Sequence, residues 1–229
     1  MAGKLELNTW VRRTAPAGVR SHFRKVAPFW KEAHETYIRQ SEGDLGYAYG
    51  ERVSVGVLAA GVWMSGMSCL EEFRTKKTVA SDRDKSVGGR GDLYITDGDT
   101  SIIVEAKHNW PRMDSKDVTL PNQIDQYLLS AISDRDCHTE DADYYAVCFL
   151  APYFDEMIKP RRAHASRDTG ETYVRSRFEF IERAAKENDL SHAVFSLALT
   201  DFEDMKDVST KKGYKRIWPG CLMIISKQP

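Results

Sequence analysis

The chain has 229 residues, and 33 lysine and arginine residues nearly balance 34 aspartate and glutamate residues, giving a formal net charge of -1. Hydrophobic residues make up 41% of the sequence and charged residues 29%, which excludes disordered, collagen-like and coiled-coil proteins. No apolar run approaches the roughly 18 residues of a membrane-spanning helix. The four cysteines form no Cys-x-x-Cys pair, and no secretory signal is recognisable, so we expect a reduced, cytoplasmic protein without membrane partners.

The first part of the chain is expected to form an N-terminal helical arm over residues 1–45. Residues 1–20 show no sustained hydrophobic period and are predicted to be loosely ordered. Apolar residues recur at helical spacing over residues 21–40, where Pro28 should break or kink the helix or divide it into a short hairpin. The remaining residues, 46–229, are expected to form the main domain.

The next segments predict a buried helix followed by strands. Residues 51–65 are apolar on most faces and favour a helix. Residues 69–79 predict a strand, and the Gly-rich segment 81–91 predicts a loop. An Asp-Gly turn joins two β-rich runs, 92–97 and 100–108, which should therefore pair as an antiparallel hairpin.

The C-terminal half alternates helices and strands. We predict helices over 121–133 and near 174–188, and strands over 144–152, 193–200 and 216–226. This order indicates an α/β protein with one central mixed β-sheet flanked by helices.

The predicted hairpin carries the residues that suggest a chemistry. Side chains at positions i and i+2 of a strand share a face, so Glu105 and Lys107 should lie side by side. The tight turn would bring Asp92 within reach of Glu105. Paired carboxylates form an oxygen site for Mg²⁺, and a neighbouring lysine can orient water and stabilise phosphoryl charge. This combination is typical of phosphodiester hydrolysis.

These residues resemble the core motif of the PD-(D/E)XK nuclease superfamily. The match consists of Gly91-Asp92, twelve intervening residues, and then Glu105-Ala106-Lys107. The segment 123–127, Gln-Ile-Asp-Gln-Tyr, is similar to the Gln-x-x-x-Tyr element of the RecB-like and lambda-exonuclease-like branch. The resemblance covers roughly residues 49–150 and implies a restriction-endonuclease-like core. Arg90-Gly91 stands here where the superfamily commonly has proline.

The resemblance implies a metal centre and a catalytic lysine. Asp92 and Glu105 would ligate Mg²⁺ together with the carbonyl oxygen of Ala106, and Mn²⁺ should substitute for Mg²⁺. Lys107 would be the catalytic lysine. Glu51 would complete the metal site through water.

Two further glutamates compete with Glu51 for that last role, since either Glu71 or Glu72 could supply the additional carboxylate. For Glu51 itself, a favourable interaction with the helix macrodipole is an equally good explanation.

Nucleic-acid contacts are expected next to the metal centre. Gln123 and Tyr127 would hold either the scissile-strand backbone or the lysine. Arg90 would add a cation, and His108, directly after the motif, would face the substrate backbone unless it is simply a histidine at a loop edge.

We therefore expect a Mg²⁺-dependent nuclease that hydrolyses phosphodiester bonds of DNA, with RNA as the alternative substrate. A first rival is a restriction-type site-specific endonuclease on the same core, for which the segment 153–173 would supply base-reading loops. A second is a nucleic-acid-binding or assembly protein that keeps the fold without turnover, and a third is an unrelated α/β protein with a chance motif. A homo-oligomer or a partner protein would supply specificity.

Overall fold

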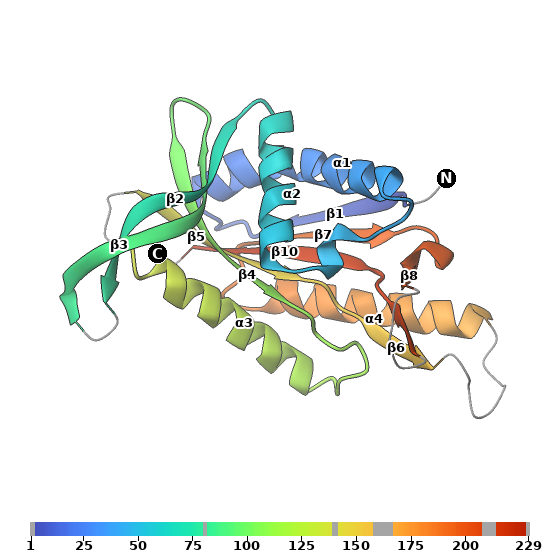
Figure 1. Ribbon diagram of the computed structural model, residues 1–229. Coiled ribbons are helices and arrows are strands. Elements are labelled where there is room, and N and C mark those ends of the chain that lie inside the picture. The colour runs from blue at the N-terminus through green and yellow to red at the C-terminus, as the bar shows by residue number, and fades with distance from the viewer. Residues whose placement is uncertain (1–2, 80–81, 139–141, 158–166, 208–213, 228–229) are drawn as a thin grey trace.

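The computed structural model describes residues 3–79, 82–138, 142–157, 167–207 and 214–227 (Figure 1). Its centre is a seven-stranded sheet with the strand order β1-β7-β10-β5-β4-β3-β2. In this order the strands are β1 (Leu5–Val11), β7 (Ala193–Leu199), β10 (Gly220–Ser226), β5 (Asp143–Leu150), β4 (Ser101–Asn109), β3 (Asp82–Thr96) and β2 (Ser68–Val79). Neighbouring strands are antiparallel except for β4 and β5, which are parallel, so the prediction of a mixed sheet is confirmed.

Helices cover both faces of this sheet. One face is covered by α1 (Arg24–Gln40) and α2 (Glu51–Met64), and the other by α3 (Thr119–Arg135) and α4 (Arg167–Glu187) (Figure 1). All four helices were expected from the sequence. Within the described residues, no helix combines the length and the apolar character needed to cross a membrane.

The shorter elements complete the fold. A π-helical turn, η1 (Val19–Phe23), precedes α1, and the 3₁₀ turns are η2 (Gly46–Ala48) and η3 (Glu203–Met205). A small second sheet has the order β6-β9-β8, formed by β6 (Phe154–Met157), β9 (Tyr214–Ile217) and β8 (Lys206–Asp207).

The N-terminal segment is more ordered than its sequence suggests. The prediction of a loosely ordered stretch over residues 1–20 is wrong for β1, which pairs along its whole length with β7. Its backbone is also held at Leu5, whose N–H donates to Glu35 Oε1 of α1 at 2.8 Å. The partner strand lies almost 190 residues away in the sequence. A pairing between such distant segments produces no hydrophobic periodicity within residues 1–20 from which the strand could be predicted. Residues on both sides of the expected boundary at residue 45 contribute to one hydrophobic core.

Helix α1 is continuous through Pro28, which favours the single-helix form of the prediction over a helical hairpin. It packs closely against α2 at Gly61. A Cβ atom at Gly61 would lie 2.8 Å from the backbone nitrogen of Trp30, so only glycine allows the two helices to approach this closely.

The prediction of a turn-rich loop over residues 81–91 is wrong for Asp82–Gly91, because β3 already begins at Asp82 and pairs with β2. The glycines make room for cross-strand side chains. A Cβ atom at Gly91 would lie 2.5 Å from the ring of Phe73, and one at Gly89 would lie 2.8 Å from the Lys77 side chain. Glycine therefore marks a close cross-strand approach here rather than a turn.

The predicted strand over 216–226 is also corrected, because its two halves belong to different sheets. Strand β9 ends at Ile217 and β10 begins at Gly220, with Pro219 in between, which has no N–H to continue a ladder. The Trp218 N–H donates to the carbonyl oxygen of Met205 at 2.7 Å. The predicted strands over 69–79, 100–108, 144–152 and 193–200 are confirmed, with ends shifted by at most two residues.

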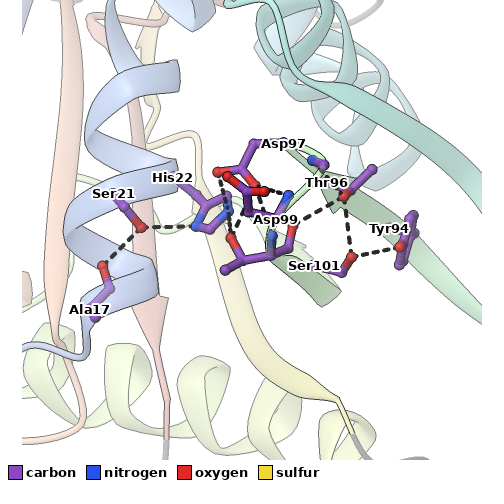
Figure 2. Close-up of polar contacts among 10 residues, drawn as sticks. Ala17, Ser21, His22, Tyr94, Thr96, Asp97, Asp99 and Ser101 are labelled. Atoms are coloured by element: carbon purple, nitrogen blue, oxygen red, sulfur yellow. Dashed lines mark hydrogen bonds and ion pairs between the residues drawn. The ribbon is translucent and has the colours of Figure 1, made fainter.

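The turn between β3 and β4 confirms the expected Asp-Gly hairpin. Asp97 Oδ1 accepts the N–H groups of Thr100 at 2.9 Å and Asp99 at 3.2 Å, and these bonds hold the pKa of Asp97 below its usual value. His22 of η1 lies against the same turn, with Nε2 3.0 Å from Thr100 Oγ1 and Nδ1 3.0 Å from Ser21 Oγ (Figure 2). The N-terminal segment thus fixes the hairpin that carries the candidate site.

Candidate active site

The candidate site lies where β3 separates from β4. The two strands are in register from Thr96 opposite Ser101 to Leu93 opposite Val104, whereas β4 continues beside β5 as far as Asn109. Beyond this point Asp92 bridges the two strands through its side chain.

The Asp92 side chain meets the Glu-x-Lys segment directly. Its Oδ2 atom accepts the backbone N–H of Ala106 at 2.7 Å. The bond brings the Asp92 carboxylate to the middle of the Glu105-Ala106-Lys107 segment. Ala106 meets Asp92 through its N–H group, and its side chain is buried in the core.

The pKa of Asp92 is raised to about 6, and its environment explains why. Burial is the largest cause; the Ala106 N–H and the charge of Lys107 oppose it, while the charges of Glu105 and Glu51 add to it. Burial and the charges of the two glutamates together make the Asp92 carboxyl harder to ionise than that of a solvent-exposed aspartate.

Glu105 is held by two nitrogen atoms. Its side chain is only 3% exposed, and its Oε1 atom lies 2.9 Å from Lys77 Nζ and 2.5 Å from His138 Nε2. The His138 ring lies 3.3 Å from Thr75 Oγ1 through Nδ1 and stacks on Tyr144 with ring centroids 4.6 Å apart. Strand β2 and the residues after α3 thus anchor this carboxylate, while its Oε2 atom takes part in neither contact.

Lys107 lies between two carboxylates. Its Nζ atom is 2.6 Å from Asp134 Oδ2 and 3.8 Å from Glu51 Oε2. Burial lowers the pKa of Lys107, but the hydrogen bond to Asp134 and the charges of Glu51, Asp134 and Asp92 outweigh it, so the pKa lies above its usual value. The lysine is therefore a fixed cation at neutral pH.

Gln123 and Tyr127 lie on α3, whereas the carboxylates paired with the Lys107 Nζ atom are those of Asp134 and Glu51. Tyr127 is half-buried, and its pKa is raised by burial and by the neighbouring Cys148 and Tyr153. The Oε1 atom of Gln123 is buried and has no hydrogen-bond partner among the described residues. In place of these residues, α3 contributes Asp134, which lies seven positions after Tyr127 and hence on the same helical face.

His108 lies on the opposite face of β4 from Glu105 and Lys107. It belongs to the strand rather than to a loop edge, and it is 8% exposed. Its Nδ1 atom lies 2.8 Å from Ser54 Oγ of α2, its ring contacts Trp110, and burial lowers its pKa to about 4. The structure therefore places His108 in the packing under α2 and not beside Asp92.

Arg90 pairs with Glu72 and not with the residues of the motif. The Arg90 side chain is 72% exposed, and it lies 2.6 Å from Glu72, which also pairs with Arg52 of α2 at 3.1 Å. Glu71 lies against α2 near Gly56. Of the three glutamates considered for the additional role, Glu51 is the one whose charge raises the pKa of Asp92.

Four residues around the motif were not among the expected site residues. They are Thr75, Lys77, Asp134 and His138. In the sequence, Lys77 stands beside two other basic residues, Arg74 and Lys76, and His138 follows Cys137, but neither pattern points to this site. Asp134 was detectable in principle, because its helical spacing from Tyr127 places both residues on one face.

The donor set has a limited capacity for a cation. Within the described part of the chain, no three His, Cys, Asp or Glu side chains are grouped as a metal site would require. The reason is visible in the ion pairs, since Glu105 faces Lys77 and His138 while Glu51 faces Lys107. The residues left for a cation are the carboxylates of Asp92 and Glu105, next to Lys107.

No protein-family model, curated protein or solved structure matches the chain. The region is identified by its own geometry. The placement of Asp92, Glu105 and Lys107 at the separation of two strands, together with the partners of each side chain, makes it the candidate active site of this α/β fold.

Proposed function

We propose that the protein is a Mg²⁺-dependent nuclease with a restriction-endonuclease-like core. One observation carries the proposal: Asp92 Oδ2 accepts the Ala106 N–H at 2.7 Å, which joins the aspartate to the Glu105-x-Lys107 segment across the gap between β3 and β4. This bond places the Asp92 carboxylate beside the Glu-x-Lys segment, which is the arrangement that a shared site requires. The same contact supports membership of the PD-(D/E)XK superfamily.

The carboxylates fit a divalent cation by their chemistry. Asp92 and Glu105 offer oxygen donors, which Mg²⁺ prefers, and Mn²⁺ accepts the same donors. The raised pKa of Asp92 reflects burial and like-charge repulsion that a cation between the carboxylates would relieve. When bound, such a cation supplies charge neutralisation at the phosphoryl oxygens and a more acidic water molecule.

Lys107 acts in this proposal as a cation and not as a base. Its pKa above the usual value keeps it protonated at neutral pH, so its Nζ atom donates hydrogen bonds to a phosphoryl oxygen or to the attacking water. Asp134 and Glu51 hold this ammonium group in place. Asp92, whose pKa is about 6, is mostly ionised at neutral pH and remains an acceptor.

The restriction-type alternative depends on base-reading loops in the segment 153–173. Residues 158–166 of this segment lie outside the described residues. The assay described below separates the two forms of the proposal by their products.

A second candidate function is nucleic-acid binding without turnover. It is favoured by the two nitrogen partners of Glu105 Oε1, Lys77 at 2.9 Å and His138 at 2.5 Å, which compete with a cation for this carboxylate. A protein of this type would keep the fold and its charges while losing metal-dependent hydrolysis.

The test uses closed circular and linear DNA, and RNA, incubated with the protein in Mg²⁺, Mn²⁺ or EDTA. The variant Lys107→Ala should abolish cutting, whereas Lys25→Ala, an exposed lysine of α1, should cut like the parent protein. Nicked circles indicate an endonuclease, a discrete set of fragments indicates sequence specificity, and shortened linear DNA indicates an exonuclease. Binding without cutting in either metal would reject the nuclease and favour the second candidate.

A further inference from the structure

The long β2–β3 hairpin forms a feature that the proposed chemistry does not use. From Phe73 opposite Gly91 to Thr78 opposite Ser86, β2 and β3 pair with each other before β4 joins β3 at Leu93. We call residues 73–79 and 82–91 the β2–β3 arm. Figure 1 shows this hairpin reaching beyond the rest of the sheet.

The arm is held in a fixed position along one edge. The Thr78 N–H donates to the carbonyl oxygen of Cys137, and Lys77 forms an isolated antiparallel bridge with His138. The arm is thus bound to the residues after α3 and presents a defined surface.

The arm is strongly basic although the whole chain is nearly neutral. Residues 74–90 contain six lysine and arginine residues against two aspartates. Arg74 and Arg90 are opposite one another in the ladder, and Lys76 is opposite Gly88, so their positions share one face of the ribbon. All three basic side chains are exposed.

This basic face carries a groove of about 920 Å³. Its lining includes the cations Arg74, Lys76 and Arg90, together with Glu72 and Gly88. A Cβ atom at Gly88 would have nothing within 4 Å, so the glycine leaves the floor of the groove open beside Lys76. The cationic side chains that line such a groove offer hydrogen-bond donors to phosphate oxygens.

We infer that the β2–β3 arm binds double-stranded DNA, with Arg74, Lys76 and Arg90 contacting phosphates. The inference rests on the proposed function, because it names duplex DNA as the substrate class of the same site. A two-stranded ribbon fits the major groove of B-form DNA. The deep, narrow major groove of duplex RNA does not admit one.

The other face of the arm connects this surface to the candidate active site. Thr75 and Lys77 alternate with Arg74 and Lys76 along β2, and they reach His138 and Glu105. Arg90 lies two residues before Asp92 on β3. A duplex held by the arm therefore lies next to the separation of β3 and β4.

The test measures binding in EDTA, so that affinity is separated from cleavage. Fluorescence anisotropy with labelled 20-base-pair DNA, the same sequence as duplex RNA and the single DNA strand would be recorded over a series of salt concentrations. The variant Arg74→Glu/Lys76→Glu reverses two charges on the arm. Its matched control, Arg24→Glu/Lys25→Glu, makes the same charge change at two exposed positions of α1.

We expect the arm variant to lose at least tenfold in affinity for duplex DNA, while the α1 control binds like the parent. The slope of log affinity against log salt should fall by about 2, because each lost phosphate contact removes roughly 0.9. Thermal unfolding of both variants checks that they fold. Equal affinity of the folded arm variant and the α1 control, tighter binding of duplex RNA or of the single strand, or no binding by the parent protein would each overturn the inference.

Different results would reject the nuclease proposal and the inference that the β2–β3 arm binds duplex DNA. A parent protein that binds duplex DNA through the arm and cuts nothing in Mg²⁺ or Mn²⁺ supports this inference and rejects the nuclease. A parent protein that cuts duplex DNA while the folded arm variant binds and cuts equally well supports the nuclease and rejects the arm.

Discussion

Asp134 Oδ2 lies 2.6 Å from Lys107 Nζ, so the last part of α3 holds the lysine of the candidate site. Glu51 lies on the other side of the same ammonium group at 3.8 Å. The lysine is thereby kept protonated between two helices that cover opposite faces of the sheet.

We predict that Asp134→Asn lowers the pKa of Lys107, because the change removes a negative charge and keeps the size of the side chain. The pKa is measurable from the ¹³Cε chemical shift of labelled lysine during a pH titration. DNA cleavage should fall by about tenfold as the ammonium group loses its position. Glu32→Gln, an exposed acid-to-amide change on α1, should alter neither quantity. An unchanged Lys107 pKa in Asp134→Asn would contradict the role of this ion pair.

We also predict that the buried carboxylate of Glu105 depends on His138. The variant His138→Phe keeps an aromatic ring beside Tyr144 but removes the partner of Glu105 at 2.5 Å. Leaving a buried carboxylate with one partner fewer should reduce the free energy of unfolding by about 2 kcal/mol.

A double-mutant cycle isolates this interaction. In a Glu105→Gln background, which has no buried charge to satisfy, the same His138→Phe change should cost about 1 kcal/mol or less. Urea denaturation at pH 7 gives all four free energies. Equal costs in the two backgrounds would show that the histidine stabilises the fold only by packing.

The hairpin of the candidate site was predictable because the turn and the two strands that form it are neighbours in the sequence. An Asp-Gly turn fixes the register, in which Leu93 lies opposite Val104, so Asp92 comes opposite the start of the Glu105-Ala106-Lys107 segment. The bond from the Ala106 N–H to Asp92 Oδ2 follows from the same register. Mixed-sheet architecture was similarly readable from the alternation of periodic segments.

The partners of these residues were not predictable because they come from distant segments. Lys77 and His138 reach Glu105 from a strand 28 residues earlier and a segment 33 residues later. The glycines before Asp92 predict a loop because glycine is typical of turns, whereas in the structure Phe73 fills the space above Gly91 in a strand ladder. Local sequence also says nothing of β1, whose partner strand begins at residue 193.

We predict that the free energy of unfolding depends on pH through the buried side chain of His34. It is 1% exposed, packs between the rings of Trp30 and Tyr47, and burial lowers its pKa from 6.5 to about 3. Between these two values the unfolded chain binds a proton that the folded chain does not. The contribution of neutral His34 is therefore complete above pH 6.5 and decreases as the pH falls towards 3, by about 1.4 kcal/mol per pH unit.

The variant His34→Leu should remove this dependence. From pH 7 to pH 5 the parent protein should lose about 2 kcal/mol of unfolding free energy relative to the variant. Denaturation curves at the two pH values measure the difference, and Ile38→Val, a buried change on the same helix that adds no titrating group, should follow the parent. Parallel pH profiles of the parent and His34→Leu would show that His34 is protonated in the folded protein.

Gly91 and Gly88 provide a matched pair for testing how the β2–β3 arm is built. A Cβ atom at Gly91 would lie 2.5 Å from the Phe73 ring, whereas one at Gly88 meets nothing within 4 Å. Gly91→Ala should therefore reduce the free energy of unfolding by about 1–3 kcal/mol, the usual cost of overpacking. Gly88→Ala should be neutral or stabilise by up to about 1 kcal/mol through the unfolded state. Adding Phe73→Leu should recover part of the loss in Gly91→Ala, whereas equal stabilities of the two alanine variants would mean that the Phe73 ring does not lie over Gly91.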